Sequence, residues 1–90
     1  MIDEVKGGGG MTAKQAVAER ILQLCSQRGI AVNALANSAG LPPSTVYSML
    51  NEKSQNPGIV TLQAVCDGLD ITLREFFDCE LFDNIEQQIK

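Results

Sequence analysis

Residues 32–51 have the sequence VNALANSAGLPPSTVYSMLN, and this stretch decides the fold. An alanine-rich segment over residues 32–39 is followed by Gly40, and a second apolar-periodic segment starts at Pro43. Glycine tolerates the positive φ that a tight turn between helices requires. Proline at the first helical position loses no hydrogen bond, and its fixed φ suits a helix. The stretch therefore predicts two short helices joined by a turn, the second running from Pro43 to Asn51.

Two short helices joined at a glycine within about twenty residues form the unit that lays its second helix in the major groove of DNA. The stretch meets the physical requirements of that unit. Ala36 is small where the helices would cross, and Leu41 supplies an apolar residue after the turn. Val46 with Met49 or Leu50 gives the second helix an apolar face toward a core.

A longer helix is predicted before this unit. Thr12 is suited to cap its start, and Gly29 is suited to end it. The apolar residues between them recur with a helical period, at Val17, Ile21, Leu24 and Cys25.

Two more helices are predicted after it. Pro57 is expected to start one, whose end Gly68 weakens, and Thr72 with Glu75 forms a capping box for the next. The fold class is therefore all-α, a compact bundle of five short helices. Residues 78–90 alternate acidic with apolar side chains and are a candidate sixth helix.

The chain divides into three parts. Residues 1–11 are expected to be a disordered leader or linker, because four consecutive glycines are entropically costly to order. Residues 12–77 form the helical domain, and residues 78–90 form the acidic amphipathic segment. The leader is either a fusion or a misassigned start with true translation from Met11. We favour the second, because Lys-Gly-Gly is what a purine-rich ribosome-binding sequence would encode.

The net charge of −4 argues against DNA binding, because DNA-binding proteins are usually basic. The distribution of the charge weakens this argument. Between Met11 and Phe77 five basic residues balance five acidic ones, so the excess acid lies near the two ends. No apolar run reaches the length of a membrane span and no signal core follows the first residues. We therefore expect a soluble, cytoplasmic protein with no membrane association.

Three cysteines and no histidine leave no ligand spacing typical of a metal site. Cys25 and Cys66 lie at apolar helical positions and are expected to pack in the core. No phosphate-binding glycine loop and no catalytic constellation is evident. We expect neither an enzyme nor a metal or other cofactor.

Ordered sequence matches extend over about two thirds of the chain, from Ala16 to Phe77. They comprise Arg20-Ile21, Leu24, Leu35-Ala36, Ala39-Gly40-Leu41, Ser44-Thr45-Val46, Asn56-Pro57, Leu62, Leu69 and residues 71–77. In these residues the chain resembles the Cro/CI repressor-type (lambda-repressor-like, XRE-type) helix-turn-helix family. The resemblance implies a five-helix DNA-binding domain whose third helix is the recognition helix. The chain departs from the family pattern at Val32, commonly Gln, at Pro42, commonly Ser or Thr, and in the less basic loop 53–55.

Docking of that helix would bring its outward residues to base edges. These candidates are Pro43, Ser44, Thr45, Tyr47, Ser48 and Asn51. Hydroxyl groups can donate or accept hydrogen bonds and so fit several bases, while Asn favours adenine. The helix has no Arg or Lys, the residues that bind guanine most specifically. We therefore expect an A·T-leaning site with modest discrimination, helped by DNA shape. Phosphate contacts are expected from Lys53, Asn56 and the amides near Gly58 and Thr61.

Each candidate has a purely structural alternative. Ser44 and Thr45 could only cap their helix, Tyr47 could be half-buried, Asn51 could merely end the helix, and Lys53 could be a solvated charge. The apolar residues of the tail are expected to cover the core rather than form an interface. They are Leu81, Phe82, Ile85 and Ile89.

Two functions remain open from the sequence. The first is a small transcriptional regulator, expected to be a repressor, that binds double-stranded DNA in a sequence-specific manner as a homodimer. The alternative is an antitoxin-like or anti-regulator module that uses the same fold to bind a protein partner through residues 78–90.

Overall fold

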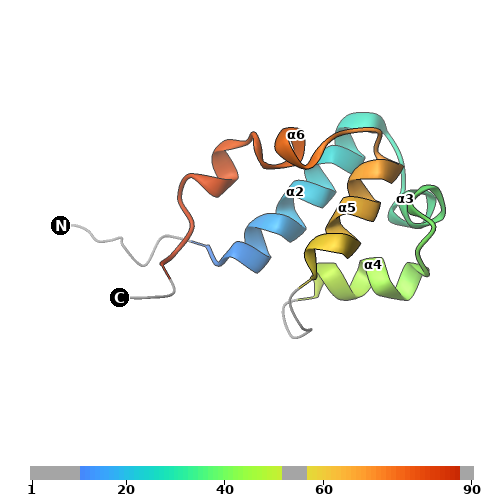
Figure 1. Cartoon of the computed structure of the whole chain (residues 1–90), viewed down its shortest axis with the longest axis horizontal. Coiled ribbons are helices and arrows are strands. Elements are labelled where there is room, and N and C mark those ends of the chain that lie inside the picture. Colours follow the sequence, from blue (N-terminus) through green and yellow to red (C-terminus); the bar gives the residue numbers. More distant parts are fainter. Residues whose placement is uncertain (1–10, 52–56, 88–90) are drawn as a thin grey trace.

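The computed structural model describes residues 11–51 and 57–87. Within these ranges it contains five α-helices and one short 3₁₀ turn, as predicted for an all-α bundle (Figure 1). The helices are α2 (Ala13–Arg28), α3 (Val32–Ala39), α4 (Pro43–Leu50), α5 (Ile59–Gly68) and α6 (Leu73–Phe77), and the turn is η1 (Glu80–Phe82). None of the described helices is long and apolar enough to cross a membrane.

The first and last α-helices begin with the capping residues that the sequence predicted. The Thr12 hydroxyl accepts a hydrogen bond from the Gln15 N–H at 3.1 Å, and the Gln15 side chain accepts from the Thr12 N–H at 2.8 Å. Thr72 and Glu75 repeat this reciprocal pair at the start of α6, at 3.0 and 2.9 Å. Both boxes supply acceptors to N–H groups that lack one inside their helix.

Three helices end with the same backbone geometry. A residue with a positive φ follows each end: Gly29 directly after α2 (64°), Gly40 directly after α3 (69°), and Asp70 (58°) one residue beyond Leu69, the C-cap of α5. The next N–H then bonds the carbonyl five residues back, from Ile30 to Cys25, from Leu41 to Ala36 and from Ile71 to Cys66, each at 3.0 Å. The donors Ile30, Leu41 and Ile71 all pack against the core. Each helix end is thus closed by a left-handed residue followed by an apolar anchor.

An aliphatic core with one large aromatic ring holds the helices together. Ile21 of α2, Leu35 of α3, Val46 of α4, Val65 of α5 and Phe76 of α6 are all fully buried. Cys25 and Cys66 are buried in the same core, as predicted. Desolvation in this core raises the pKa of both thiols.

The packing of α3 against α5 explains Gly68. A Cβ at this position would lie 2.8 Å from the backbone nitrogen of Ala39, closer than atoms can approach without a shift. The missing side chain of Gly68 therefore leaves room for the backbone of α3, a larger role than the weak helix end that the sequence predicted. α5 itself starts at Ile59, with Gly58 as its N-cap, instead of at Pro57.

The expectation of a sixth helix in the tail is wrong for the part that the structure describes, because residues 78–87 contain only the 3₁₀ turn η1. The Phe82 ring lies 4.9 Å from Phe77 and 6.0 Å from Phe76, centroid to centroid, so this turn packs onto α6. After a turn at residues 83–84 the chain reaches Ile85, which forms an isolated parallel bridge with Met11. Tertiary contacts therefore override the helical pattern of the tail.

Met11 belongs to the folded part of the chain, although the sequence placed it in the leader. Its carbonyl accepts a hydrogen bond from the Glu86 N–H at 2.9 Å. The apolar tail residues Leu81, Phe82 and Ile85 are all partly buried, so they cover the fold as expected. Ile89 lies outside the described residues.

Candidate nucleic-acid interface

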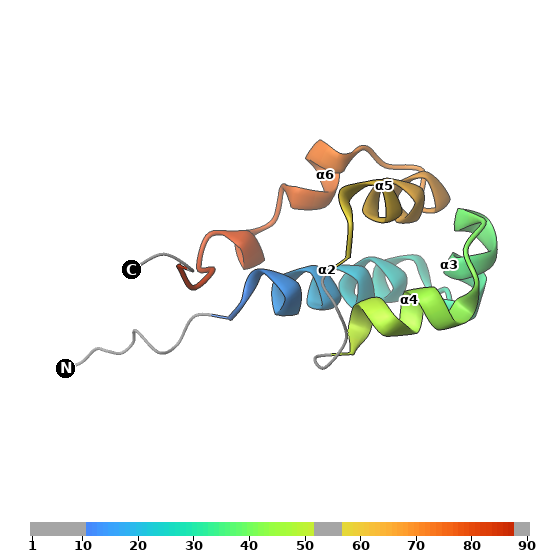
Figure 2. The same cartoon turned by 60° about the horizontal axis from the view of Figure 1, so that its bottom comes forward.

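α3, the turn at Gly40 and α4 form the helix-turn-helix unit that the sequence predicted. α4 runs along one edge of the molecule in both views (Figures 1 and 2) and packs against α3 and α2. Pro42 is its extended N-cap, with φ −60° and ψ 140°, and Pro43 is its first residue. The helix ends at Leu50, and Asn51 is its C-cap instead of its last helical residue.

One face of α4 is anchored in the core. Val46 is fully buried and Met49 is 3% exposed, while Leu50 is half-buried. These positions recur at the helical period, so the opposite face must point outward. The anchored face fixes the orientation of α4 relative to the rest of the domain.

The outward face of α4 is polar and uncharged. Pro43, Ser44 and Ser48 are exposed, and Tyr47 is 49% exposed, so its ring is not held in the core. Thr45 is half-buried. The result is a narrow edge that carries hydroxyl groups and one aromatic ring.

The side-chain caps proposed as an alternative for Ser44 and Thr45 are not observed. The first turn of α4 has no side-chain cap, and the Thr45 N–H instead bonds the Pro42 carbonyl at 2.9 Å. Ser44 is exposed and Thr45 is half-buried, so the Ser44 side chain is the more accessible of the two.

Asn51 lies at the other end of α4 and is exposed. Its backbone N–H donates to the Ser48 carbonyl at 3.2 Å, and its carbonyl accepts a hydrogen bond from the Lys14 ammonium. In this position the residue ends the helix and still presents its side chain at the surface.

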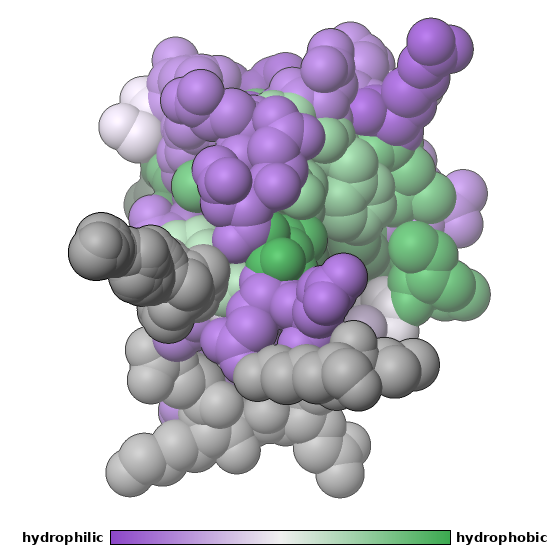
Figure 3. Space-filling model, turned by 90° about the vertical axis from the view of Figure 1, so that its left-hand side faces the viewer, coloured by the Kyte–Doolittle hydropathy of each residue, from purple (hydrophilic) through white to green (hydrophobic). Residues whose placement is uncertain are grey.

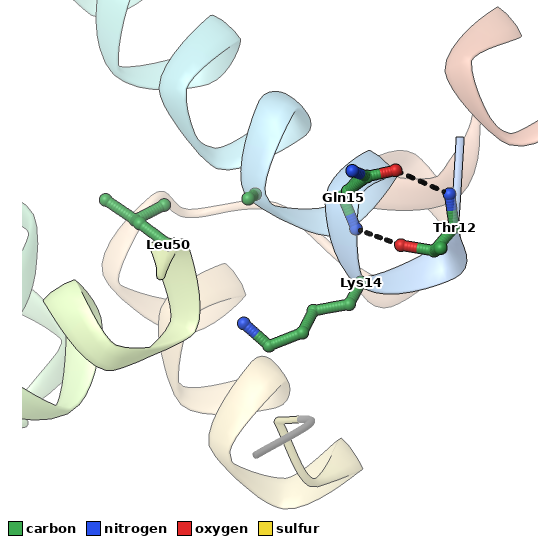
Figure 4. A pocket seen from close by; sticks show the side chains of 5 residues that line it. Thr12, Lys14, Gln15 and Leu50 are labelled. Atoms are coloured by element: carbon green, nitrogen blue, oxygen red, sulfur yellow. Dashed lines mark hydrogen bonds between the residues drawn. The ribbon is translucent and has the colours of Figure 1, made fainter. Parts of the chain in front are cut away.

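Lys14 is a residue at this site that sequence reasoning missed. Its side chain extends from the first turn of α2 toward the C-terminal end of α4, which Leu50 marks in Figure 4. A cation at this end of a helix stabilises the exposed carbonyls. No local signal could have predicted the contact, because the two partners are 37 residues apart.

The helices differ in how their N-termini are capped. α2 and α6 are capped by Thr12 and Thr72, whereas the N-caps of α3, α4 and α5 are Ala31, Pro42 and Gly58, none of which makes a side-chain cap hydrogen bond. Amides of an uncapped first turn lack intrahelical acceptors and favour anions. The start of α3, which the sequence analysis did not consider, is one of these uncapped helix ends.

The predicted phosphate-contacting residues are only partly described. Thr61 lies in the first turn of α5 and is half-buried, next to the uncapped amides at Gly58. Lys53 and Asn56 lie outside the described residues. The structure therefore places Thr61 at an uncapped helix start, and the phosphate contacts of Thr61, Lys53 and Asn56 remain predictions.

The fold and this interface define a class of protein, the helix-turn-helix DNA-binding domains of transcription regulators. Residues 20–81 match the model of the Cro/C1-type HTH DNA-binding domain. Since this match spans more than half of the chain, the protein belongs to the Cro/C1-type helix-turn-helix family. The resemblance inferred from the sequence is confirmed.

Solved structures support the same assignment. The crystal structure of the prophage Lp1 protein 11 is 36% identical, with a TM-score of 0.71, over 77% of this chain and 91% of that one. The restriction-modification controller protein C.Esp1396I shares the fold, with 21% identity and a TM-score of 0.68 over 79% of this chain and 90% of its own. One structure of that controller protein is bound to a 19 base pair DNA duplex. No curated protein matches the chain.

Proposed function

We propose that this protein is a sequence-specific regulator of transcription that inserts α4 into the major groove of double-stranded DNA. The observation that carries the proposal is the two-sided character of α4. Val46 and Met49 hold it in the core, while Ser44, Tyr47 and Ser48 lie on its outward face. A helix presented in this way fits the width of the major groove and can contact base edges with its N-terminal residues.

The composition of α4 suggests what it would recognise. Its outward residues carry hydroxyls and no guanidinium or ammonium group. Hydroxyls discriminate weakly among bases, and Tyr47 can contact a thymine methyl group or a phosphate. We therefore infer an A·T-leaning site in which DNA shape contributes to specificity.

Phosphate contacts would position the helix on the duplex. The uncapped amides of α3 and α5 are suited to bind phosphates, and we assign Thr61, Lys53 and Asn56 to the same role. Asn51, at the end of α4, is assigned to a base or phosphate at the edge of the site.

We infer that the protein represses transcription as a homodimer on a pseudo-palindromic site. One small module seldom buries enough surface for tight specific binding, and two identical modules suit a twofold symmetric sequence. The controller protein of the same fold has been solved with an operator site, which is the kind of target proposed here.

Selection of bound duplexes from a random pool tests the proposal. The full chain is expected to enrich one short A·T-leaning motif. Ser44→Ala and Ser48→Ala should each change the preferred base at one position and lower affinity for the original site about fivefold, because one hydrogen bond to a base is lost.

Ser26→Ala is the matched control, because Ser26 is an exposed serine on α2, away from the α4 edge. It should leave both the motif and the affinity unchanged. If no duplex is enriched, or if Ser44→Ala and Ser48→Ala behave as Ser26→Ala does, α4 is not the recognition element.

A further inference from the structure

The C-terminal end of α4 differs from the ends of the other long helices. A residue with a positive φ follows α2, α3 and α5, and its geometry lets a local N–H group bond one of their last carbonyls. The C-cap of α4, Asn51, is extended instead, with φ −90° and ψ 124°. An end of this kind leaves carbonyls for donors from outside the helix.

Lys14 supplies such a donor from another helix. Its ammonium group donates to the Asn51 carbonyl, and Figure 4 shows its side chain reaching from α2 toward the end of α4. Lys14 and Leu50 line the same hollow of about 230 Å³. Figure 3 views the side of the molecule where α2 begins and shows polar and hydrophobic surface adjoining there. Lys14 is half-buried, as a lysine is when its stem lies along apolar surface.

The position of Lys14 is unfavourable for its own helix. Lys14 is the second residue of α2, and the first turn of α2 contains no acidic residue. A cation is repelled by the positive N-terminal end of a helix and attracted by the negative C-terminal end. The charge of Lys14 therefore costs α2 stability and stabilises the end of α4, so its favourable role lies in the contact between the two helices.

The contact adds a constraint that the core does not supply. Val46 and Met49 hold α4 through apolar burial, which is strong but not directional. Burial thus determines which face of α4 points outward, but it limits the angle of the helix less strictly. A hydrogen bond has a preferred distance and direction, so the bond from Lys14 restrains the C-terminal end of α4 relative to α2.

We propose that Lys14 is a positioning residue of the DNA-binding site. It holds the end of α4 against the start of α2 and so sets the angle at which Ser44 and Ser48 meet the base pairs. The inference rests on the proposed function, and it assigns to Lys14 no contact of its own with DNA.

Binding of two duplexes to the full chain tests this role, one with the selected motif and one of unrelated sequence, each at several salt concentrations. Lys14→Met keeps an unbranched apolar stem and removes the ammonium group. It should lower affinity for the motif about fivefold and change affinity for the unrelated duplex by no more than about twofold. The salt dependence should stay the same, because no phosphate contact is lost. Lys14→Arg, which keeps a cationic donor, should restore affinity for the motif to within about twofold.

Amide hydrogen exchange of the free chain tests the hold on α4 without DNA. In Lys14→Met the amides of Leu50 and Asn51 should exchange about threefold faster or more, because the end of the helix opens more often.

Arg74→Met is the matched control for both measurements. Arg74 is likewise the second residue of a helix with a threonine capping box, and it is exposed. Its helix, α6, lies on the opposite side of the molecule from α4 (Figures 1 and 2). The control should change neither the affinities nor the exchange of the α4 amides.

The outcomes separate this inference from the proposed function. Equal losses on both duplexes refute positioning: with a salt slope smaller by about one, Lys14 contacts a phosphate, and with an unchanged slope it only supports folding. A variant that binds and exchanges as the wild-type chain does refutes the inference and spares DNA recognition by α4. Faster exchange in Lys14→Met, in a protein that binds no duplex, supports the hold on α4 and refutes the proposed function.

Discussion

Gly40 and Asp70 have the same left-handed backbone conformation, but only Asp70 carries a side chain that makes this conformation costly. Both have a positive φ and follow a helix. A Cβ at Gly40 would meet no atom within 4 Å, so any cost of a side chain there is conformational and not steric. Asp is among the few non-glycine residues that tolerate this region, though at some cost.

Substitutions at these two positions should therefore have opposite signs. Gly40→Ala should lower the free energy of unfolding by about 1–2 kcal/mol, while Asp70→Gly should raise it by about 0.5 kcal/mol. Urea denaturation followed by circular dichroism measures both. Equal stability of Gly40→Ala and the wild-type chain would mean that the turn does not depend on a left-handed residue.

At the contact of α3 with α5, the backbone of one helix limits the size of a side chain on the other. Gly68 allows the α3 backbone at Ala39 to come close, and α3 in turn supports α4. The orientation of α4 therefore depends on a residue that is distant from it in sequence.

Gly68→Ala should destabilise the domain by about 1–3 kcal/mol, because the added methyl group meets backbone that cannot rotate away. Alanine favours helices, so a gain in stability would show that α3 yields easily. Gln63→Ala, at an exposed position of the same helix, is the control and should be neutral or slightly stabilising. Thermal unfolding of the two variants measures the difference.

The elements that sequence predicted well are those with local signals. Thr12, Thr72 and Gly29 each act through atoms within a few residues, so their patterns are visible in one short window. The contacts it missed join distant residues. Arg20 is an example, because its guanidinium donates to the carbonyls of Phe76 at 2.7 Å and Glu75 at 2.9 Å, more than fifty positions away.

The candidate site likewise has features that the local sequence predicts and features that it does not. The outward face of α4 followed from helical periodicity, since buried Val46 and Met49 fix which residues point out. The support of α4 by Lys14 and the hidden role of Gly68 depend on how helices cross, which no single window encodes. The prediction of a helix in the tail failed for a related reason. The sequence pattern of the tail suits a helix, but Phe82 packs against Phe77 and Ile85 pairs with Met11 instead.

The whole molecule should become less stable at high pH. Burial raises the pKa of the Cys25 and Cys66 thiols above the ordinary value of 9.0, and the Asp67 carboxylate raises that of Cys66 further. The folded state then holds these protons more tightly than the unfolded state does. Their stabilising contribution is complete below pH 9.0 and is lost as the pH rises through the folded pKa values.

Urea denaturation at neutral pH and at increasing alkaline pH should show this decline. It should be weaker in Cys25→Ala with Cys66→Ala than in the wild-type chain, even though that variant starts less stable. Cys79→Ser is the control, because this variant also removes a thiol but from a residue that is only partly buried. An identical slope in all three proteins would exclude the buried thiols as its cause.

The hydrogen bond from Glu86 to Met11 brings the two ends of the described fold together. Figure 1 places them at the opposite side of the molecule from the Gly40 turn and the first residues of α4. A fluorescent protein or an affinity tag joined to either of these ends would thus emerge from a common point, remote from the first residues of α4. Circular permutation is also open, because a short linker across that gap would let new ends be cut elsewhere in the chain.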